Sequence, residues 1–248
     1  MAIFLLKKSY QANNQKEIGF KDLWGSHGVF TTIKLIGKPG KLVLFKNHFD
    51  GLIKSLKKYK IYTKNIEEKT KHLIHSSINE NINYDHLLRV ALTKKFISIS
   101  IRKRLKPKKN FELKIINYRR IDPITKNLYY KKILNEFNRH DPTKTDIALV
   151  YKGKILETCT SNILFSKNKE YFTPKNNCYI GNTIKYLKGK IKISFKDIYY
   201  KDLKKFDEIM LIGSGKGVTP VKYIKEMNWK SKNTLGYKKV KKYLNFKS

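Results

Sequence analysis

Hydrophobic residues recur along this chain with two periods, and each period predicts a different kind of element. Apolar positions at i, i+3, i+4 and i+7 predict two amphipathic helices, built on Phe49, Leu52, Ile53 and Leu56 and on Tyr130, Ile133, Leu134 and Phe137. The segments "NTIKYLKGK" (182–190) and "NTLGYKKVKKYL" (233–244) also look helical, although each contains a glycine.

β-rich runs separated by turn residues predict strands and two hairpins. The first hairpin lies in "HGVFTTIKLIGKPGKLVLF" (27–45), with its turn at 37–40, and the second in "DIALVYKGKILET" (146–158), turning at Lys152 and Gly153. Further strands are expected at 86–93, 96–102, 161–165, 171–174, 192–200, 208–214 and 218–224.

The order of these elements predicts an α/β class with α+β character and mixed sheets, because strands and helices alternate without a strict βαβ repeat. Two Pro-marked polar segments, "RLKPKKN" and "YRRIDPITKN", lie near the middle of the chain. We therefore expect two domains, a smaller N-terminal α/β domain at 1–118 and a larger C-terminal domain at 119–248.

Composition supports a globular protein without a membrane span. Of its 248 residues, 40% are hydrophobic, and no run approaches the roughly 20 apolar residues that a spanning helix needs. The start of the chain has too short an apolar run for a signal peptide. The two cysteines, Cys159 and Cys178, form no CxxC pair. A reduced cytoplasmic setting is the simplest expectation.

The net charge of +36 raises the alternative of a polyanion-binding protein. Only six of the 55 basic residues are arginine, whereas dedicated nucleic-acid surfaces favour arginine for bidentate contacts. The lysines are spread from Lys7 to Lys247 rather than gathered in one segment. We therefore expect a solvated lysine surface, with nucleic acid an improbable partner.

Two residues are candidates for carbonyl chemistry. Lys126 follows the Pro-fixed segment "IDPIT" and precedes an apolar helix, where lost solvation would make its amine nucleophilic toward an aldehyde. Glu157 lies inside a predicted buried strand in "ILETCTSNILF", where a carboxylate could face a pyridine nitrogen. Taken alone, Lys126 is more typical of a surface lysine, and Glu157 is more typical of an ion-paired glutamate.

Two turns of small residues could expose backbone N–H groups to a phosphate. They are "IGNTIKY" (180–186) and "LIGSGKGVTPV" (211–221). Neither fits a known nucleotide fingerprint, and an ordinary turn is the alternative for each. The six histidines show no metal-ligand pattern, so no metal site is predicted.

In this order the segments resemble the class IV aminotransferase-like family of pyridoxal 5'-phosphate (PLP) enzymes. That family includes 4-amino-4-deoxychorismate lyase and the branched-chain and D-amino-acid aminotransferases. The resemblance runs from about Gly28 to "TPVKYI" and is strongest in "ETCTSNILF", followed by "YFTP", "IGNT" and "FDEIMLIGSGKGVTPV". "GVFTTIKL" and "NHFDGLIKSL" resemble the family's first strand and its His-marked helix.

The resemblance implies a two-domain fold of the class IV PLP-dependent type. It makes Lys126 the Schiff-base lysine, in the C-terminal domain with most PLP contacts, and Glu157 the partner of the pyridine nitrogen. It also makes phosphate-binding candidates of Gly181, Asn182, Thr183, Ser214 and Gly215.

Two positions depart from the family pattern. Gly51 stands where the family has an arginine three residues after the histidine, and Ile184 stands where an arginine usually follows the phosphate turn. Lys54 or Lys185 could act as point charges instead, without bidentate geometry.

The resemblance implies a small-molecule amino substrate and a homodimer. Compact length, and "GVFTT" in place of the "FEGIR"-like signature of branched-chain enzymes, favour a lyase that releases pyruvate and 4-aminobenzoate, a folate precursor. The alternatives are a class IV aminotransferase, a catalytically lapsed relative, or a basic polyanion-binding protein.

Overall fold

The computed structural model describes residues 3–246, which divide into two compact units. The first unit comprises residues up to 104 together with 125–131, and the second comprises 105–124 and 132–246. These bounds differ from a single boundary after Tyr118, because the chain returns to the first unit at 125–131. Lys126 consequently belongs to the first unit, and a C-terminal domain that supplies most PLP contacts stays a prediction.

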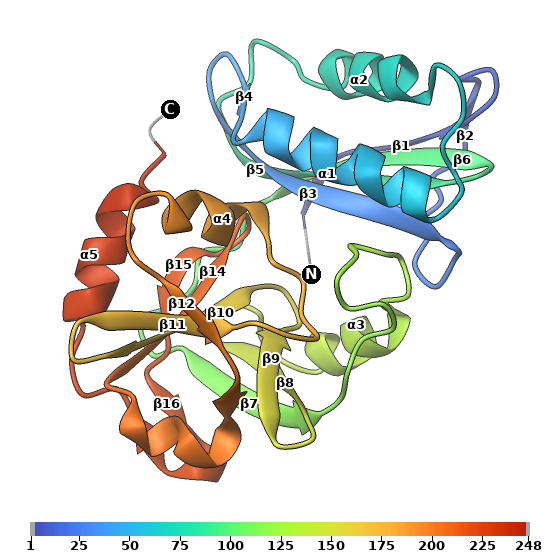
Figure 1. Cartoon of the computed structure of the whole chain (residues 1–248). Coiled ribbons are helices and arrows are strands. Elements are labelled where there is room, and N and C mark those ends of the chain that lie inside the picture. The colour runs from blue at the N-terminus through green and yellow to red at the C-terminus, as the bar shows by residue number, and fades with distance from the viewer. Residues whose placement is uncertain (1–2, 247–248) are drawn as a thin grey trace. The chain divides into compact units, whose positions relative to one another are not determined.

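Over its described residues, the first unit forms a six-stranded sheet in the order β2-β1-β6-β5-β3-β4 and two helices, α1 and α2 (Figure 1). The bounds of the strands are β1 Phe4–Gln11, β2 Glu17–Ile18, β3 Gly28–Gly37, β4 Lys41–Leu42, β5 Tyr84–Thr93 and β6 Phe96–Lys103. The helices are α1 Phe45–Lys58 and α2 Ile66–Ser76.

Strict alternation of side chains gives this sheet one apolar face. Alternate residues of its central strands belong to one core cluster with the buried residues of α1 and α2; they include Val29, Ile33, Leu35, Leu88, Val90, Leu92, Ile97, Ile99 and Ile101. The intervening positions carry more polar residues, such as Ser98, which shares a 2.8 Å hydrogen bond with Ser9. Both helices therefore pack on the face that the period of two makes apolar.

The segment 125–131 lies along the beginning of β3. The backbone N–H of Phe30 donates to the carbonyl of Lys126 at 2.9 Å, and that of Leu128 donates to Gly28 at 2.9 Å. Val29 and Asn127 form an antiparallel bridge. The backbone of Lys126 is thus fixed to the edge of this sheet.

In its described part, the second unit has two sheets, three α-helices and two short 3₁₀ helices, Tyr200–Lys205 and Lys225–Met227 (Figure 1). The five-stranded sheet has the order β12-β11-β10-β14-β15, and the six-stranded sheet has the order β13-β9-β8-β7-β16-β17. Its elements are β7 Glu112–Asn117, α3 Lys131–Asn138, β8 Thr145–Tyr151, β9 Lys154–Thr158, β10 Asn162–Lys167, β11 Glu170–Pro174, α4 Asn182–Lys188, β12 Ser194–Lys196, β13 Ile198–Tyr199, β14 Glu208–Gly213, β15 Gly217–Pro220, β16 Tyr223–Ile224, β17 Trp229–Lys230 and α5 Leu235–Tyr243.

Strand β10 is buried on both faces. Ile163 and Phe165 belong to the core shared by the two sheets, whereas Leu164 belongs to a second core with residues of α4 and α5. A strand between two cores needs apolar residues on both faces, so its sequence is a continuous apolar run, as in "NILF". The position of β10 is consequently fixed by packing on both of its faces.

The predicted elements are largely confirmed. The helix at Phe49–Leu56 is α1, the helix after Lys126 is α3, and the hairpin at Lys152–Gly153 joins β8 to β9. The mixed α/β class with mixed sheets is also confirmed. Between residues 3 and 246, no helix is long and apolar enough to cross a membrane.

Candidate functional site

Glu157, the carboxylate expected to face a pyridine nitrogen, lies near the end of β9 and is 5% exposed. Its Oε1 accepts a hydrogen bond from Arg120 Nε at 2.7 Å, and Arg120 is 2% exposed. The backbone N–H of Tyr179 approaches Oε2 at 3.4 Å. A buried carboxylate is tolerated here because a buried guanidinium compensates its charge, a partner that the sequence alone did not reveal.

The phosphate-binding candidates at 181–183 are fixed to the same motif through Asn162. Asn162 Nδ2 donates to the carbonyl of Tyr179 at 2.6 Å, and its Oδ1 accepts from the backbone N–H of Gly181 at 2.9 Å. Gly181 has extended backbone and precedes α4, in which Asn182 and Thr183 are buried. One side chain therefore positions the start of α4 against β10.

The second candidate turn, between β14 and β15, also meets this motif. Gly213 and Gly217 are paired across the turn, with Ser214 and Gly215 between them. A Cβ added to Gly213 would lie 3.2 Å from Ser161 Oγ and 3.4 Å from the carbonyl of Thr160. The absence of a side chain at Gly213 lets the turn approach the residues that follow Glu157.

The segment 157–162 therefore contacts both candidate phosphate-binding turns and carries the candidate pyridine partner. These contacts all lie within the second unit. A carboxylate facing a guanidinium favours the ionised form, which is the acceptor that a ring N–H requires. Two glycine-containing turns lie directly against this segment, since an added Cβ would meet Asn162 Oδ1 at 2.9 Å from Gly181 and Ser161 Oγ at 3.2 Å from Gly213. This donor set suits PLP.

Lys126 lies in the first unit and is half-buried. Its ammonium lies 5.0 Å from the centroid of the Phe30 ring. The preceding residue, Thr125, is buried, and its Oγ1 accepts a hydrogen bond from Lys58 Nζ at 2.8 Å. The role of Lys126 as the Schiff-base lysine stays a prediction, as do the cofactor contacts of Glu157 and of the two turns.

His48, the histidine that marks α1, is buried and shares a 2.9 Å hydrogen bond between its Nδ1 and Thr31 Oγ1. Burial, together with the nearby charge of Lys126, lowers the pKa of His48 from 6.5 to about 3. His48 is therefore neutral at physiological pH and links α1 to β3 as a structural hydrogen-bonding residue.

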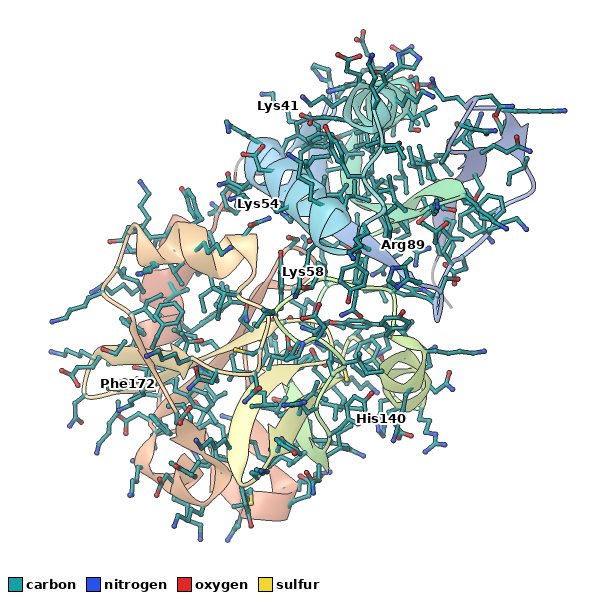
Figure 2. All side chains as sticks on the ribbon, turned by 45° about the vertical axis from the view of Figure 1, so that its right-hand side comes forward. Lys41, Lys54, Lys58, Arg89, His140 and Phe172 are labelled. Atoms are coloured by element: carbon teal, nitrogen blue, oxygen red, sulfur yellow. The ribbon has the colours of Figure 1, made fainter. Side chains whose placement is uncertain are left out.

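The two departures from the family pattern have different surroundings. Gly51 lies within α1, and its carbonyl accepts a hydrogen bond from Ser55 Oγ at 2.8 Å. Lys54 and Lys58 both project from the same helix (Figure 2). Ile184, in contrast, is fully buried in the core of α4 and α5, while Lys185 beside it is exposed.

Both cysteines are unsuited to nucleophilic chemistry. Cys159 and Cys178 are buried, and burial raises the pKa of each thiol, to about 12 for Cys178. Within the described chain, no three His, Cys, Asp or Glu side chains gather closely enough to hold a metal ion.

Comparison with known proteins identifies the family. The model for amino-transferase class IV matches residues 28–224. A curated relative from Haemophilus influenzae, an uncharacterized protein, is 25% identical over 99 residues, which are 39% of this chain. The match covers 53% of that relative, so the chain matches about half of its length.

Solved structures share the fold at low identity. A branched-chain aminotransferase from Thermoproteus uzoniensis superposes with a TM-score of 0.77 at 16% identity, covering 98% of this chain and 94% of that one. A putative 4-amino-4-deoxychorismate lyase from Legionella pneumophila gives 0.73 at 17% identity, covering 88% and 90%. The PLP-bound form of a hypothetical aminotransferase from Mycobacterium tuberculosis gives 0.71 at 13% identity, covering 96% and 97%.

The matched residues span most of the chain, from the start of β3 to the end of β16, and include every candidate site residue described above. The chain therefore belongs to the class IV amino-transferase family, whose members are PLP-dependent enzymes.

Proposed function

We propose that this enzyme is a 4-amino-4-deoxychorismate lyase, which releases pyruvate and 4-aminobenzoate. One observation supports a PLP site most directly. The segment "ETCTSNILF" contains Glu157 and also contacts both glycine-containing turns. An uncharged carboxylic acid would be a poor acceptor for the N–H of the pyridine ring. Turns far from that acceptor could not bind the phosphate of the same cofactor. The segment has a suitable acceptor and two suitable turns at one place.

Each candidate residue has a defined role in this proposal. When bound, PLP supplies an electron sink for the bond that breaks. Lys126 would hold the cofactor through its amine and, once the substrate amine replaces it, move the proton at the substrate carbon that bears nitrogen. Glu157 would keep the ring nitrogen of the cofactor protonated by accepting its N–H hydrogen bond. Arg120 stabilises the ionised state of Glu157.

The phosphate would be bound mainly by backbone and hydroxyl groups. Gly181, Asn182 and Thr183 on one side, and Ser214 with Gly215 on the other, would donate hydrogen bonds to its oxygens. Because Gly51 and Ile184 replace two arginines of the family pattern, positive charge would come from lysine. Lys54 lies one turn after Gly51, and Lys58 lies one further turn along α1.

The lyase is favoured over an aminotransferase by the first strand of the family pattern. This chain has "GVFTT" at 28–32 instead of the "FEGIR"-like signature of branched-chain enzymes, and Thr31 is used in a hydrogen bond to His48. An aminotransferase acting on branched-chain or D-amino acids is the second candidate, since branched-chain enzymes have the same fold.

The decisive experiment supplies aminodeoxychorismate and measures pyruvate and 4-aminobenzoate together. Equal release of both products, lost in Lys126→Ala and retained in Lys131→Ala, is the expected result. Borohydride treatment should attach the cofactor to the peptide that contains residue 126. Rapid amino transfer from branched-chain or D-amino acids, with no release of 4-aminobenzoate, would instead establish the aminotransferase.

We also propose that the enzyme is a cytoplasmic homodimer acting on a small-molecule amino substrate, as the family resemblance implies. Light scattering on the purified chain should give twice the 29.3 kDa mass of one chain. Binding to DNA that is tight, steeply dependent on salt and unaffected by PLP would favour the polyanion-binding alternative.

A further inference from the structure

Asp146 is the most deeply buried carboxylate of the second unit, with no exposed surface. Its Oδ2 accepts hydrogen bonds from Thr158 Oγ1 at 2.9 Å and from Thr160 Oγ1 at 2.7 Å. Its Oδ1 accepts from the backbone N–H of Ile147 at 2.8 Å. Asp146 on β8 thus fixes the residues that directly follow Glu157.

The charge of Asp146 is compensated by Lys216, which lies in the turn between β14 and β15. Lys216 Nζ is 3.5 Å from Asp146 Oδ2, and the Lys216 side chain is only 9% exposed. The ammonium lies 4.7 Å from the ring centroid of Phe111 and 5.6 Å from that of Phe137. It also donates to the carbonyl of Pro142 at 3.4 Å.

Burial of Lys216 contrasts with the exposed lysines that give the chain its high charge. Removing an ammonium from water is unfavourable unless an opposite charge and further polar groups surround it. Here a carboxylate, a carbonyl and two aromatic faces do so. If the turn required only a polar residue at position 216, an exposed side chain would be sufficient there.

We propose that Asp146 and Lys216 are positioning residues that hold the 213–217 turn in the conformation that receives the cofactor phosphate. This inference rests on the function proposed above. Lys216 anchors the turn after Ser214 and Gly215, and the close approach of Gly213 to Ser161 anchors it before them. The same carboxylate fixes Thr158 and Thr160, so the turn and the strand of Glu157 have a common support.

Lys216 acts through the turn rather than as a phosphate ligand, because Asp146 already compensates its charge. Support of this kind pre-organises backbone donors, and at metal sites the loss of comparable outer contacts typically weakens binding by about 10–100-fold. The effect should be confined to ligands that carry the phosphate. A role in global stability alone would weaken binding of every ligand to the same degree.

The test compares PLP with pyridoxal, which lacks the phosphate, by absorbance titration of the full-length protein. Lys216→Met should weaken PLP about tenfold or more while changing pyridoxal binding less than about twofold. Asp146→Asn should also weaken PLP more than pyridoxal, although pyridoxal binding should fall too, because Asp146 fixes Thr158 beside Glu157. Thr160→Val, which removes one hydroxyl and preserves side-chain volume, provides a milder variant if either substitution prevents folding.

Glu208→Gln is a matched control. Glu208 is a buried carboxylate of the same unit, and its oxygens accept from the backbone N–H groups of Gly236 and Tyr237 at 2.7 and 2.9 Å. Its substitution should lower stability and leave the ratio of PLP affinity to pyridoxal affinity unchanged. An unchanged ratio in Lys216→Met, Asp146→Asn and Thr160→Val would overturn the proposal.

Hydrogen exchange on the cofactor-free protein separates this inference from the proposed function. The amides of residues 214–217 should exchange faster in Lys216→Met than in the wild type, whereas those of β10 should not. Failure of the wild type to prefer PLP over pyridoxal would refute the phosphate site. Unchanged exchange at 214–217 would refute the anchoring role, whatever the wild type binds.

Discussion

Arg120 and Glu157 form a buried ion pair, with Arg120 Nε donating to Glu157 Oε1 at 2.7 Å. The pair joins the segment that follows β7 to the end of β9, and the two residues are 37 positions apart in the sequence. Arg120 Nη2 also donates to the carbonyl of Pro123 at 2.5 Å. The guanidinium therefore fixes both the carboxylate and the chain that leads toward Lys126.

Loss of this guanidinium should be strongly destabilising. Arg120→Met leaves a buried carboxylate without compensation, so the free energy of unfolding should fall by about 3–5 kcal/mol in urea titrations. Adding Glu157→Gln should recover most of that loss. The exposed pair of Arg139 and Glu136 provides the control, since Arg139→Met should change stability by less than about 1 kcal/mol. Equal effects at Arg120 and Arg139 would contradict the assignment.

His48 should make stability depend on pH. Its pKa falls from the ordinary 6.5 to about 3 on folding, so the unfolded chain binds more protons between these values. Stability should therefore rise with pH across this window, by up to about 1.4 kcal/mol per pH unit from His48 alone. The contribution is fully present above about pH 6.5 and is lost as the pH falls toward 3.

The measurement is the free energy of unfolding at several pH values for the wild type and for His48→Gln. The variant should show a shallower slope between pH 3 and 6.5, because it lacks the titrating group. His72→Gln, at an exposed position of α2, should retain the wild-type slope. Parallel curves for wild type and His48→Gln would refute the prediction.

Restoring arginine at Gly51 should strengthen cofactor binding. A guanidinium can bind a phosphate bidentately where a lysine offers only a point charge, so Gly51→Arg should tighten PLP about tenfold. Gly51→Ala is the control for helix propensity, which should stabilise α1 by about 0.5–1 kcal/mol without changing PLP affinity. Identical affinities for Arg, Ala and Gly at this position would place residue 51 away from the phosphate.

A side chain at Gly181 should be destabilising. A Cβ there would lie 2.9 Å from Asn162 Oδ1, the atom that accepts the Gly181 N–H. Gly181→Ala should therefore cost about 1–3 kcal/mol of stability and weaken PLP binding. Gly19→Ala, where an added Cβ meets nothing within 4 Å, should be nearly neutral. In the double variant Gly181→Ala, Asn162→Ala, the loss of stability should be smaller than the sum of the two single losses, because both changes remove the same hydrogen bond.

Periodicity identified the helices in which apolar buried residues recur at i, i+3, i+4 and i+7. In α1 these residues are Phe49, Leu52, Ile53 and Leu56, beside the buried His48, and the position of α1 was predicted. Helix α2 was not predicted, because its buried positions include Thr70 among Ile66, Leu73 and Ile74. Strand β1 was also missed, since only two of its eight residues, Ser9 and Tyr10, are buried.

The candidate site was only partly accessible from sequence. The motif around Glu157 and the two turns could be located by resemblance, but their supporting residues could not. Lys216 is one lysine among 49, and Asp146 contacts it across 70 positions of sequence. Arg120 had one available signal, since an arginine is uncommon in a chain that uses only six.

Strand β10 supports both cores of the second unit, and the residues before it border the candidate site while Glu157 and Thr158 make buried hydrogen bonds to Arg120 and Asp146. Selection for a folded chain alone would therefore preserve "ETCTSNILF", even in a descendant that had stopped turning over substrate. Conservation of this motif among relatives would therefore not indicate that they are catalytically active. The role proposed for Lys126 is chemical, so this is the position where natural variation would reveal whether the enzyme is still under selection for catalysis.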